Sequence, residues 1–414
     1  MKALVIDHSI FPALALRLAA ELGEEIGYHS PPFSSFPDPR DQLIGAGLED
    51  YGVKRVDFLW EQIQKDTPEI FVFPDLFFSD LQDYLRNEGY NVWGGGWGEL
   101  LELDRWKLYR VLRAAGEPVP DMLTASGIDD LAFKLREDRQ FVKIAQYYRG
   151  LCETYEWRGH KASGSWLAGL RKDVMPAELR YMIQPPIEGK AVEPGLDKIV
   201  VNGLPLFPML MGYEKKDSAL LSMVIEEIPE WAAPVFPVLD ELADYNYTNF
   251  ASAEIRRTKD ESFLTDFTAR LPRPGDGIHM KIWSNLGTVI EQGARGKPMA
   301  PHPVAKYAGQ LVFNSQHLAD NPLHVIVPPE YEDNVILWRF TRDKDGDLWV
   351  LPNILHDTQV GSVVVVGDSI DEIKEQCLEI AGSIKADQLT FERDAFDEIE
   401  KDIDQGGING AQWG

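Results

Sequence analysis

The N-terminal part of the chain alternates short, mostly apolar runs with stretches of helical spacing. Three runs, Lys2 to Asp7, Glu69 to Phe73 and Tyr90 to Trp93, are typical of strands buried in a parallel sheet. Apolar residues recur with helical spacing over 11–22, 53–65 and 79–88. This order predicts a parallel α/β sheet with right-handed crossovers.

A helix stop follows this first unit. Residues 102–115 have helical spacing, and Gly116 is followed by Pro118 and Pro120. Glycine often ends a helix, and proline cannot continue one. The pattern therefore predicts a domain boundary near residue 116.

Beyond residue 116, short apolar runs predict a second unit and, from about Pro301, a third. Strands are expected at 141–144, 180–183, 198–201, 206–212, 309–314, 335–341 and 362–366. Residues 249–256 and 262–270 alternate and are linked by charged residues, which predicts an antiparallel hairpin. Helices are expected over 276–291, over 368–385 with Ser369 as the N-cap, and as a docked amphipathic segment within 387–404.

Composition and charge narrow the classes of protein. The chain has 414 residues, 44% hydrophobic and 26% charged, which is ordinary globular composition. Its net charge of -26 argues against wrapping a nucleic-acid backbone and against docking on an anionic membrane. Two cysteines cannot form a disulfide framework or a cysteine zinc site, which fits a reducing compartment. We therefore expect a cytoplasmic protein.

Common nucleotide and hydrolase motifs do not match. The run from Gly94 to Gly98 is followed by Glu99 where a dinucleotide fingerprint needs glycine, and it follows the third strand instead of the first. Neither Gly189-Lys190 nor Gly296-Lys297 is followed by the Ser or Thr of a P-loop. The sequence also has no H-E-x-x-H and no G-x-S-x-G motif.

Two features instead suggest a phosphate ligand and an adenine ring. Lys143 interrupts an apolar strand, where a charge is costly unless it is paired, and the following turn to Gly150 could close over phosphates. The strand ending at Gln184 meets Pro185 and Pro186, so Ile187 supplies the next backbone donor of a rigid apolar hinge. A snorkelling lysine and a plain interdomain linker are the alternatives.

The predicted hairpin suggests a metal site. With a period of two, Asp266, Thr268 and Arg270 share a face, and so do Glu254 and Arg256. Carboxylates facing each other across two strands repel unless a cation lies between them, and hard oxygen ligands suit Mg²⁺ bound to phosphates. Arg270 could hold a phosphate or carboxylate in a bidentate manner. The alternative is a salt-bridged surface ladder.

A strand with one lysine, a hinge and an acidic hairpin, in that order behind a small α/β domain, resembles the ATP-grasp superfamily. The resemblance is closest to glycinamide ribonucleotide synthetase and extends from the N-terminal domain to near residue 400. It implies a mixed α/β and α+β fold: a Rossmann-like pre-ATP-grasp domain over 1–115, an ATP-grasp domain over 116–300 and a small C-terminal domain over 301–414. Residues 119–182 would form the lid subdomain.

The resemblance also implies roles for individual residues. Lys107 and Lys143 would contact ATP phosphates together with Gly150, the backbone near Gln184 and Ile187 would bind adenine, and Glu193 would hold the ribose. Glu254, Asp266 and Thr268 would be the metal site, for Mg²⁺ or alternatively Mn²⁺. Lys143 and Arg270 would neutralise charge during phosphoryl transfer.

The activity implied is ATP-dependent joining of a carboxylate to an amine through an acylphosphate. Its partners would be a small carboxylate and an amine, in a monomer or homodimer. The family's substrate loop, "GGREH", corresponds here to Asp7-His8-Ser9-Ile10-Phe11, so the resemblance does not extend to phosphoribosylamine as the substrate. A non-catalytic ATP-binding module for regulation or assembly, and an α/β scaffold without nucleotide, are the alternatives.

Overall fold

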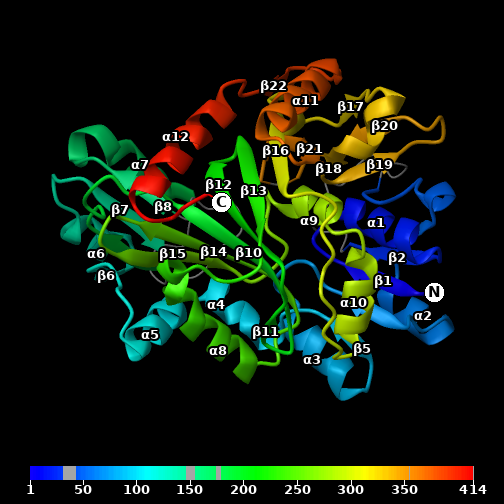
Figure 1. Cartoon of the computed structure of the whole chain (residues 1–414), viewed down its shortest axis with the longest axis horizontal. Helices are drawn as coiled ribbons and strands as arrows, with labels where there is room; N and C mark the ends of the chain where they lie inside the picture. The colour runs from blue at the N-terminus through cyan, green and yellow to red at the C-terminus, as the bar shows by residue number, and fades with distance from the viewer. Residues whose placement is uncertain (31–42, 146–153, 174–178, 354, 414) are drawn as a thin grey trace.

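The computed structural model describes residues 1–30, 43–145, 154–173, 179–353 and 355–413. The turn that ends at Gly150 lies outside these residues. Figure 1 shows an N-terminal α/β unit at one side, a large sheet across the centre and a small separate sheet, β6 to β9, at the opposite side. In the described part of the chain, no helix combines the length and apolar character needed to cross a bilayer.

The N-terminal unit is a parallel sheet, as the apolar runs predicted. All four neighbouring pairs are parallel. Its order is β3 (Val53–Arg55), β2 (Ile26–His29), β1 (Ala3–Ile6), β4 (Ile70–Val72) and β5 (Asn91–Trp93). The predicted helix over 53–65 is wrong in its first part, because Val53 is buried and pairs with Ile26 at the sheet edge. The helix α2 (Leu59–Lys65) begins only afterwards.

Helices cover both faces of this sheet. On one face, α2 and α3 (Ser79–Asn87) contribute Ile63 and Leu85 to a core with Leu4 and Phe71. The other face is covered by α1 (Pro12–Leu22) and by α10 (Leu286–Ala294), which returns from the middle of the chain. Residues far apart in sequence therefore share one core.

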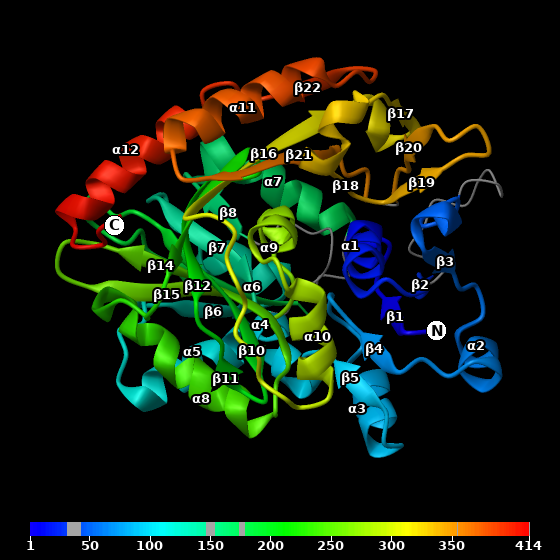
Figure 2. The same ribbon diagram turned by 45° about the vertical axis from the view of Figure 1, so that its right-hand side comes forward.

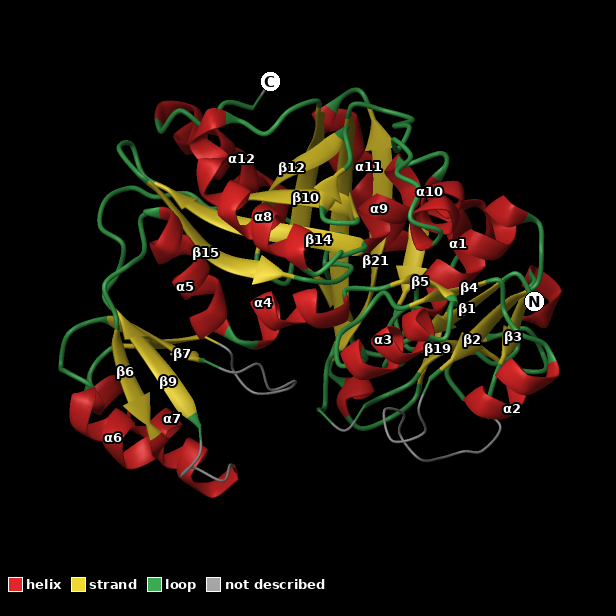
Figure 3. Ribbon diagram, turned by 90° about the horizontal axis from the view of Figure 1, so that it is seen from below, coloured by secondary structure: helices red, strands yellow, loops and turns green. Residues whose placement is uncertain are grey.

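A four-stranded antiparallel sheet forms a separate layer, which Figure 3 shows away from the rest of the molecule. Its order is β6 (Leu123–Ser126), β9 (Arg180–Gln184), β7 (Gln140–Ile144) and β8 (Thr154–Trp157). Two helices, α6 (Gly127–Lys134) and α7 (His160–Asp173), accompany it. Ile128, Leu131, Trp157 and Tyr181 belong to its own apolar core. The helices α4 (Leu100–Leu103) and α5 (Arg105–Ala115) precede it in the chain.

The large central sheet joins strands from the second and third predicted domains. Its order is β15 (Ser262–Thr268), β14 (Asn249–Arg257), β10 (Pro194–Val201), β12 (Met209–Lys215), β13 (Ala219–Ile225), β16 (Tyr307–Ser315), β21 (Gln359–Gly367) and β18 (Val335–Leu337). Two short strands, β11 (Leu204–Pro205) and β22 (Leu389–Phe391), pair with β10 and β16. The expected boundary at 301 falls between β13 and β16, which are hydrogen-bonded neighbours. The division into three domains stays a prediction.

The remaining elements complete the C-terminal part. A three-stranded sheet has the order β17 (Leu323–Val325), β20 (Leu348–Val350) and β19 (Phe340–Arg342). The other helices are α8 (Phe236–Asp244), α9 (Asp276–Ile282), α11 (Ile370–Ser383) and α12 (Ala395–Ile408). The Ser369 side chain caps α11 by accepting a bond from Glu372 N, as predicted. Phe396 and Ile399 of α12 are buried, so the acidic C-terminal segment is a docked helix.

Two predicted elements are divided in the structure. The helix expected over 276–291 is α9 followed by α10, because Trp283 has extended backbone and Asn285 precedes the new helix. The strand expected over 335–341 is β18 and β19 in two different sheets. Arg339 between them has a φ of +49°, which turns the chain.

Candidate functional site

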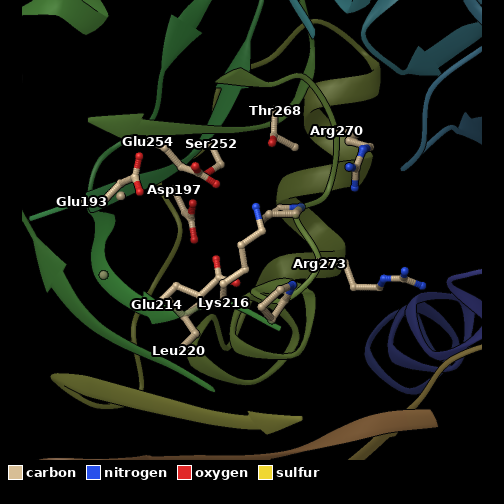
Figure 4. A pocket seen from close by; sticks show the side chains of 14 residues that line it. Glu193, Asp197, Glu214, Lys216, Leu220, Ser252, Glu254, Thr268, Arg270 and Arg273 are labelled. Atoms are coloured by element: carbon tan, nitrogen blue, oxygen red, sulfur yellow. The ribbon is translucent and has the colours of Figure 1, made fainter. Parts of the chain in front are cut away.

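A polar cavity of about 130 Å³ lies on the central sheet, where β10, β12, β14 and β15 run side by side (Figure 4). Side chains on alternate positions of these strands point to one face, which gathers acids and bases from distant parts of the chain. The charged side chains that line it are Glu193, Asp197, Glu214, Lys216, Glu254, Arg270 and Arg273. Ser252 and Thr268 add hydroxyl groups.

Glu254 and Asp266 face each other across the hairpin, as the alternation predicted. A bulge follows Glu254, so that Ile255 pairs with Leu264 and the Thr265 hydroxyl bonds to the carbonyl oxygen of Glu254 at 3.2 Å. Burial, together with the negative charges of Asp266, Glu193 and Glu214, raises the pKa of Glu254 to about 8. This carboxylate is therefore costly to ionise without an added cation.

Asp266 has positive neighbours instead. Its carboxylate accepts a bond of 3.2 Å from Arg105, and burial disfavours its charged form. The positive charges of Arg105 and Lys143 outweigh burial and hold the pKa of Asp266 below its ordinary value. Lys143 is buried and donates to the carbonyl oxygen of Thr265 at 2.9 Å. The lysine in the apolar strand thus lies beside the hairpin, as its unusual sequence position suggested.

Arg105 was missed by sequence reasoning, which selected Lys107 on the same helix. Asp104 caps α5 through the amide of Trp106, and this places Arg105 at the buried start of the helix. Arg105 also donates to the carbonyl oxygen of Ile144, so it links the strand of Lys143 to the hairpin. Its only sequence signal was its position after a capping aspartate at a helix start.

Asp197, Glu214 and Lys216 were also missed. Burial raises the pKa of Asp197, and burial raises that of Glu214 to about 7. Lys216 extends into the cavity from the turn after β12 (Figure 4). Burial lowers its pKa, but the charges of Glu254 and Glu214 outweigh burial and raise it. Glu193 and Asp197 on β10, and Glu214 and Lys216 at β12, are each two residues apart, which was the available signal.

The two cavity arginines are bound to internal carboxylates. Arg270 forms an ion pair of 3.1 Å with Glu102, which also accepts a bond from Ala269 N. Arg273 pairs with Asp357 at 3.2 Å and is directed away from the acids of the cavity (Figure 4). Thr268 lies opposite Ser252 in the hairpin and lines the same cavity.

Several predicted site residues lie elsewhere. Lys107 forms an ion pair of 2.8 Å with Glu241, lies 5.0 Å from the ring centre of Tyr245, and is not among the described residues that line the cavity. The Gln184 side chain is buried and donates to Tyr109 at 3.2 Å. The remaining two predicted binders are differently placed: Ile187 is half-buried in the loop between β9 and β10.

Glu193 is at the exposed edge of the cavity. It accepts a bond of 3.0 Å from the Thr265 hydroxyl and lies 3.6 Å from Arg256. The structure therefore brings Lys143, Glu193, Glu254, Asp266, Thr268 and Arg270 to one region. Lys107 contacts α8 instead.

The donor set fits a hard divalent cation bound together with phosphate. Within the described residues, no group of three His, Cys, Asp or Glu side chains is arranged to hold a metal by itself. Mg²⁺ commonly uses only one or two carboxylates, with phosphate oxygens and water as its other ligands. Glu254 and Asp266 supply these carboxylates, and their mutual repulsion is a reason for a cation to bind there.

Comparison with known proteins gives the fold. No protein-family model and no curated protein sequence matches the chain. Among solved structures, the chain is similar to phosphoribosylamine–glycine ligase from Thermotoga maritima, with a TM-score of 0.70 and 15% identity over 95% of this chain and 99% of that one. The chain therefore has the ATP-grasp fold that its motifs predicted.

Two further structures share this fold. One is the biotin carboxylase domain of 2-oxoglutarate carboxylase from Hydrogenobacter thermophilus, solved as a dimer with MgADP and bicarbonate. Its TM-score is 0.66 and its identity 10%, over 96% of this chain and 98% of that one. The other is L-amino acid ligase from Bacillus licheniformis, with a TM-score of 0.59 and 14% identity over 95% and 99%.

Proposed function

We propose that the protein is an ATP-dependent ligase that joins a small carboxylate or amino acid to an amine through an acylphosphate. The observation that supports it most is the facing pair Glu254 and Asp266 beside Lys143 and Arg105. Solved ligases of the same fold, among them L-amino acid ligase, agree with this reaction class. ATP and Mg²⁺ would be required, with Mn²⁺ as a substitute.

Each charged group has a part in this proposal. Glu254 and Asp266 would hold Mg²⁺, which supplies charge neutralisation on the phosphates. Lys143, fixed by the carbonyl oxygen of Thr265, would orient the transferred phosphoryl group. Arg270 would bind the negative charge that develops on the substrate carboxylate. Phosphoryl transfer needs positioning and charge more than a protein nucleophile, which suits this set of residues.

The start of α1 favours an amine without a phosphate group. The Asp7 carboxylate accepts bonds from the backbone amides of Ser9, Ile10 and Phe11 at 2.9, 3.0 and 2.6 Å. Amides at a helix start commonly bind phosphate, and here they already hold an internal anion. We therefore propose an unphosphorylated amine, such as an amino acid, as the acceptor.

Amine-dependent release of ADP tests the proposal. We expect Asp266→Asn and Lys143→Ala each to lose at least about a hundredfold in kcat, because each removes charge at the transferring phosphate. Glu261→Gln, in the exposed turn of the same hairpin, is the matched control and should retain wild-type turnover. Wild-type rates in both site variants would contradict the residue assignment.

A non-catalytic ATP-binding module is the second candidate. The internal ion pairs of Arg270 with Glu102 and of Lys107 with Glu241 favour it, because both cations are already neutralised. This candidate predicts saturable binding of Mg·ATP with no ADP formed for any acid and amine in a panel. A single acid and amine pair that releases ADP stoichiometrically with a C–N product excludes it.

A further inference from the structure

A second cavity, of about 320 Å³, lies at the opposite end of α9 from the polar one. It is enclosed by α1, by the end of α9 and by residues around β18, β19 and β20, elements that Figure 2 shows grouped together. Its walls are mainly apolar, with Leu16, Met280, Ile336, Phe340 and Leu348 among them. The volume is at the lower end of the range of small-molecule pockets, about 300 to 1,000 Å³.

The three cations around this cavity differ in their partners. Arg17 forms an ion pair of 2.9 Å with Glu21 and donates to the carbonyl oxygens of Met280 and Trp283. Arg342 pairs with Glu332 at 3.3 Å and lies over the ring of Tyr51 at 4.7 Å. Both guanidinium groups are therefore neutralised by the chain itself.

Lys281 lacks such a partner within the described residues. Its side chain is half-buried in the cavity wall, and no carboxylate there lies within 4.0 Å of its Nζ. Burial lowers the pKa of Lys281; the charge of the exposed Asp333 opposes this, and Arg17 adds to it. A half-buried ammonium without a counter-charge is costly, and an anion in the cavity would relieve that cost.

We propose that this cavity binds a small apolar carboxylate, with its hydrocarbon part against the walls and its carboxylate on Lys281. One unpaired lysine matches a single negative charge. A phosphate ester carries about two charges and would face one free cation beside Asp333, so a monoanion is the better match. The site is separate from the polar cavity and does not depend on the proposed ligase activity.

Calorimetric titration of the nucleotide-free protein tests this site. The probe is 4-phenylbutanoate, and 4-phenylbutan-1-ol is its uncharged equivalent. We expect the acid to bind saturably and Lys281→Met to weaken it by about tenfold, with little change for the alcohol. Lys297→Met, at an exposed lysine outside the cavity, is the control and should bind the acid as wild type does.

A second variant separates loss of the site from loss of folding. Ala20 is exposed on α1 and lines the cavity, so Ala20→Phe should fill the space without removing a core contact. We expect it to weaken the acid and the alcohol alike while its thermal unfolding stays near wild type. The proposal is overturned if wild-type protein shows no saturable binding of the acid, or if Lys281→Met binds it as tightly as wild type.

Discussion

Two buried carboxylates, Asp7 and Glu254, have opposite surroundings. Asp7 accepts bonds from three backbone amides and from the Tyr28 hydroxyl, the last at 2.7 Å. Glu254 has no side-chain hydrogen bond within the described residues and faces Asp266, Glu193 and Glu214. Burial raises the pKa of both groups, but only Asp7 has donors that offset the effect.

The difference separates a structural carboxylate from a candidate ligand-binding one. The chain itself supplies every partner that Asp7 uses, so this acid stabilises the loop between β1 and α1. The partner that Glu254 lacks must come from outside, and a divalent cation with phosphate would supply it. Burial alone does not distinguish the two cases, whereas the number of donors does.

The largest expected effect is on stability and comes from Asp7→Ala. Removing the carboxylate leaves the amides of Ser9, Ile10 and Phe11 without their acceptor, so we expect the free energy of unfolding to fall by about 3 kcal/mol. Urea denaturation measures it. Asp7→Asn keeps one acceptor oxygen and should lose less, and equal losses in the two variants would contradict this account of the loop.

An intermediate effect is expected in the pH dependence of stability. Because the pKa of Glu254 is about 8 in the folded chain and near 4.5 when unfolded, the folded state binds more protons between these values. Stability should therefore fall by about 1 to 2 kcal/mol as the pH rises from about 5 to 8. Glu254→Gln should flatten this part of the profile.

Mg²⁺ with ATP sharpens the same measurement. Bound cation would favour the ionised form of Glu254, so the fall in stability toward pH 8 should shrink in the wild type when Mg·ATP is saturating. Thermal unfolding at several pH values is the measurement. A profile that Mg·ATP leaves unchanged, although binding is saturated, would place the cation away from Glu254.

The smallest effect is expected for Lys107→Met. Lys107 is engaged with Glu241 and Tyr245, so the variant should raise the KM for ATP only about threefold. Kinetics of ADP release measure it beside Lys143→Ala. A loss as large as that of Lys143→Ala would mean that Lys107 exchanges Glu241 for phosphate, as the family resemblance implies.

Much of the fold was predictable from sequence because burial imposes clear periods. The parallel strands are continuous apolar runs, and the hairpin of Glu254 and Asp266 alternates with a charged turn. Elements set by tertiary contacts were harder. Val53–Arg55 has the spacing of the helix after it and becomes a strand only because Ile26 lies beside it.

The site was predictable where one charge interrupts an apolar pattern. Lys143 and Asp266 were found for this reason, and they lie together beside the hairpin. Arg105 was missed because its role depends on how α5 packs on the hairpin, a distance of 161 residues along the chain. Asp197, Glu214 and Lys216 were missed because each belongs to a different strand or turn, whose order in the sheet the sequence does not state.

The continuity of the central sheet across residue 301 has a mechanical consequence. Ladder bonds join Ala219 through Met223 of β13 to Leu311 through Tyr307 of β16, while α10 is packed on the N-terminal sheet. A protease that cuts the exposed segment at 296–298 would sever the peptide without separating its two parts. The nicked chain should elute as one particle and come apart only in denaturant.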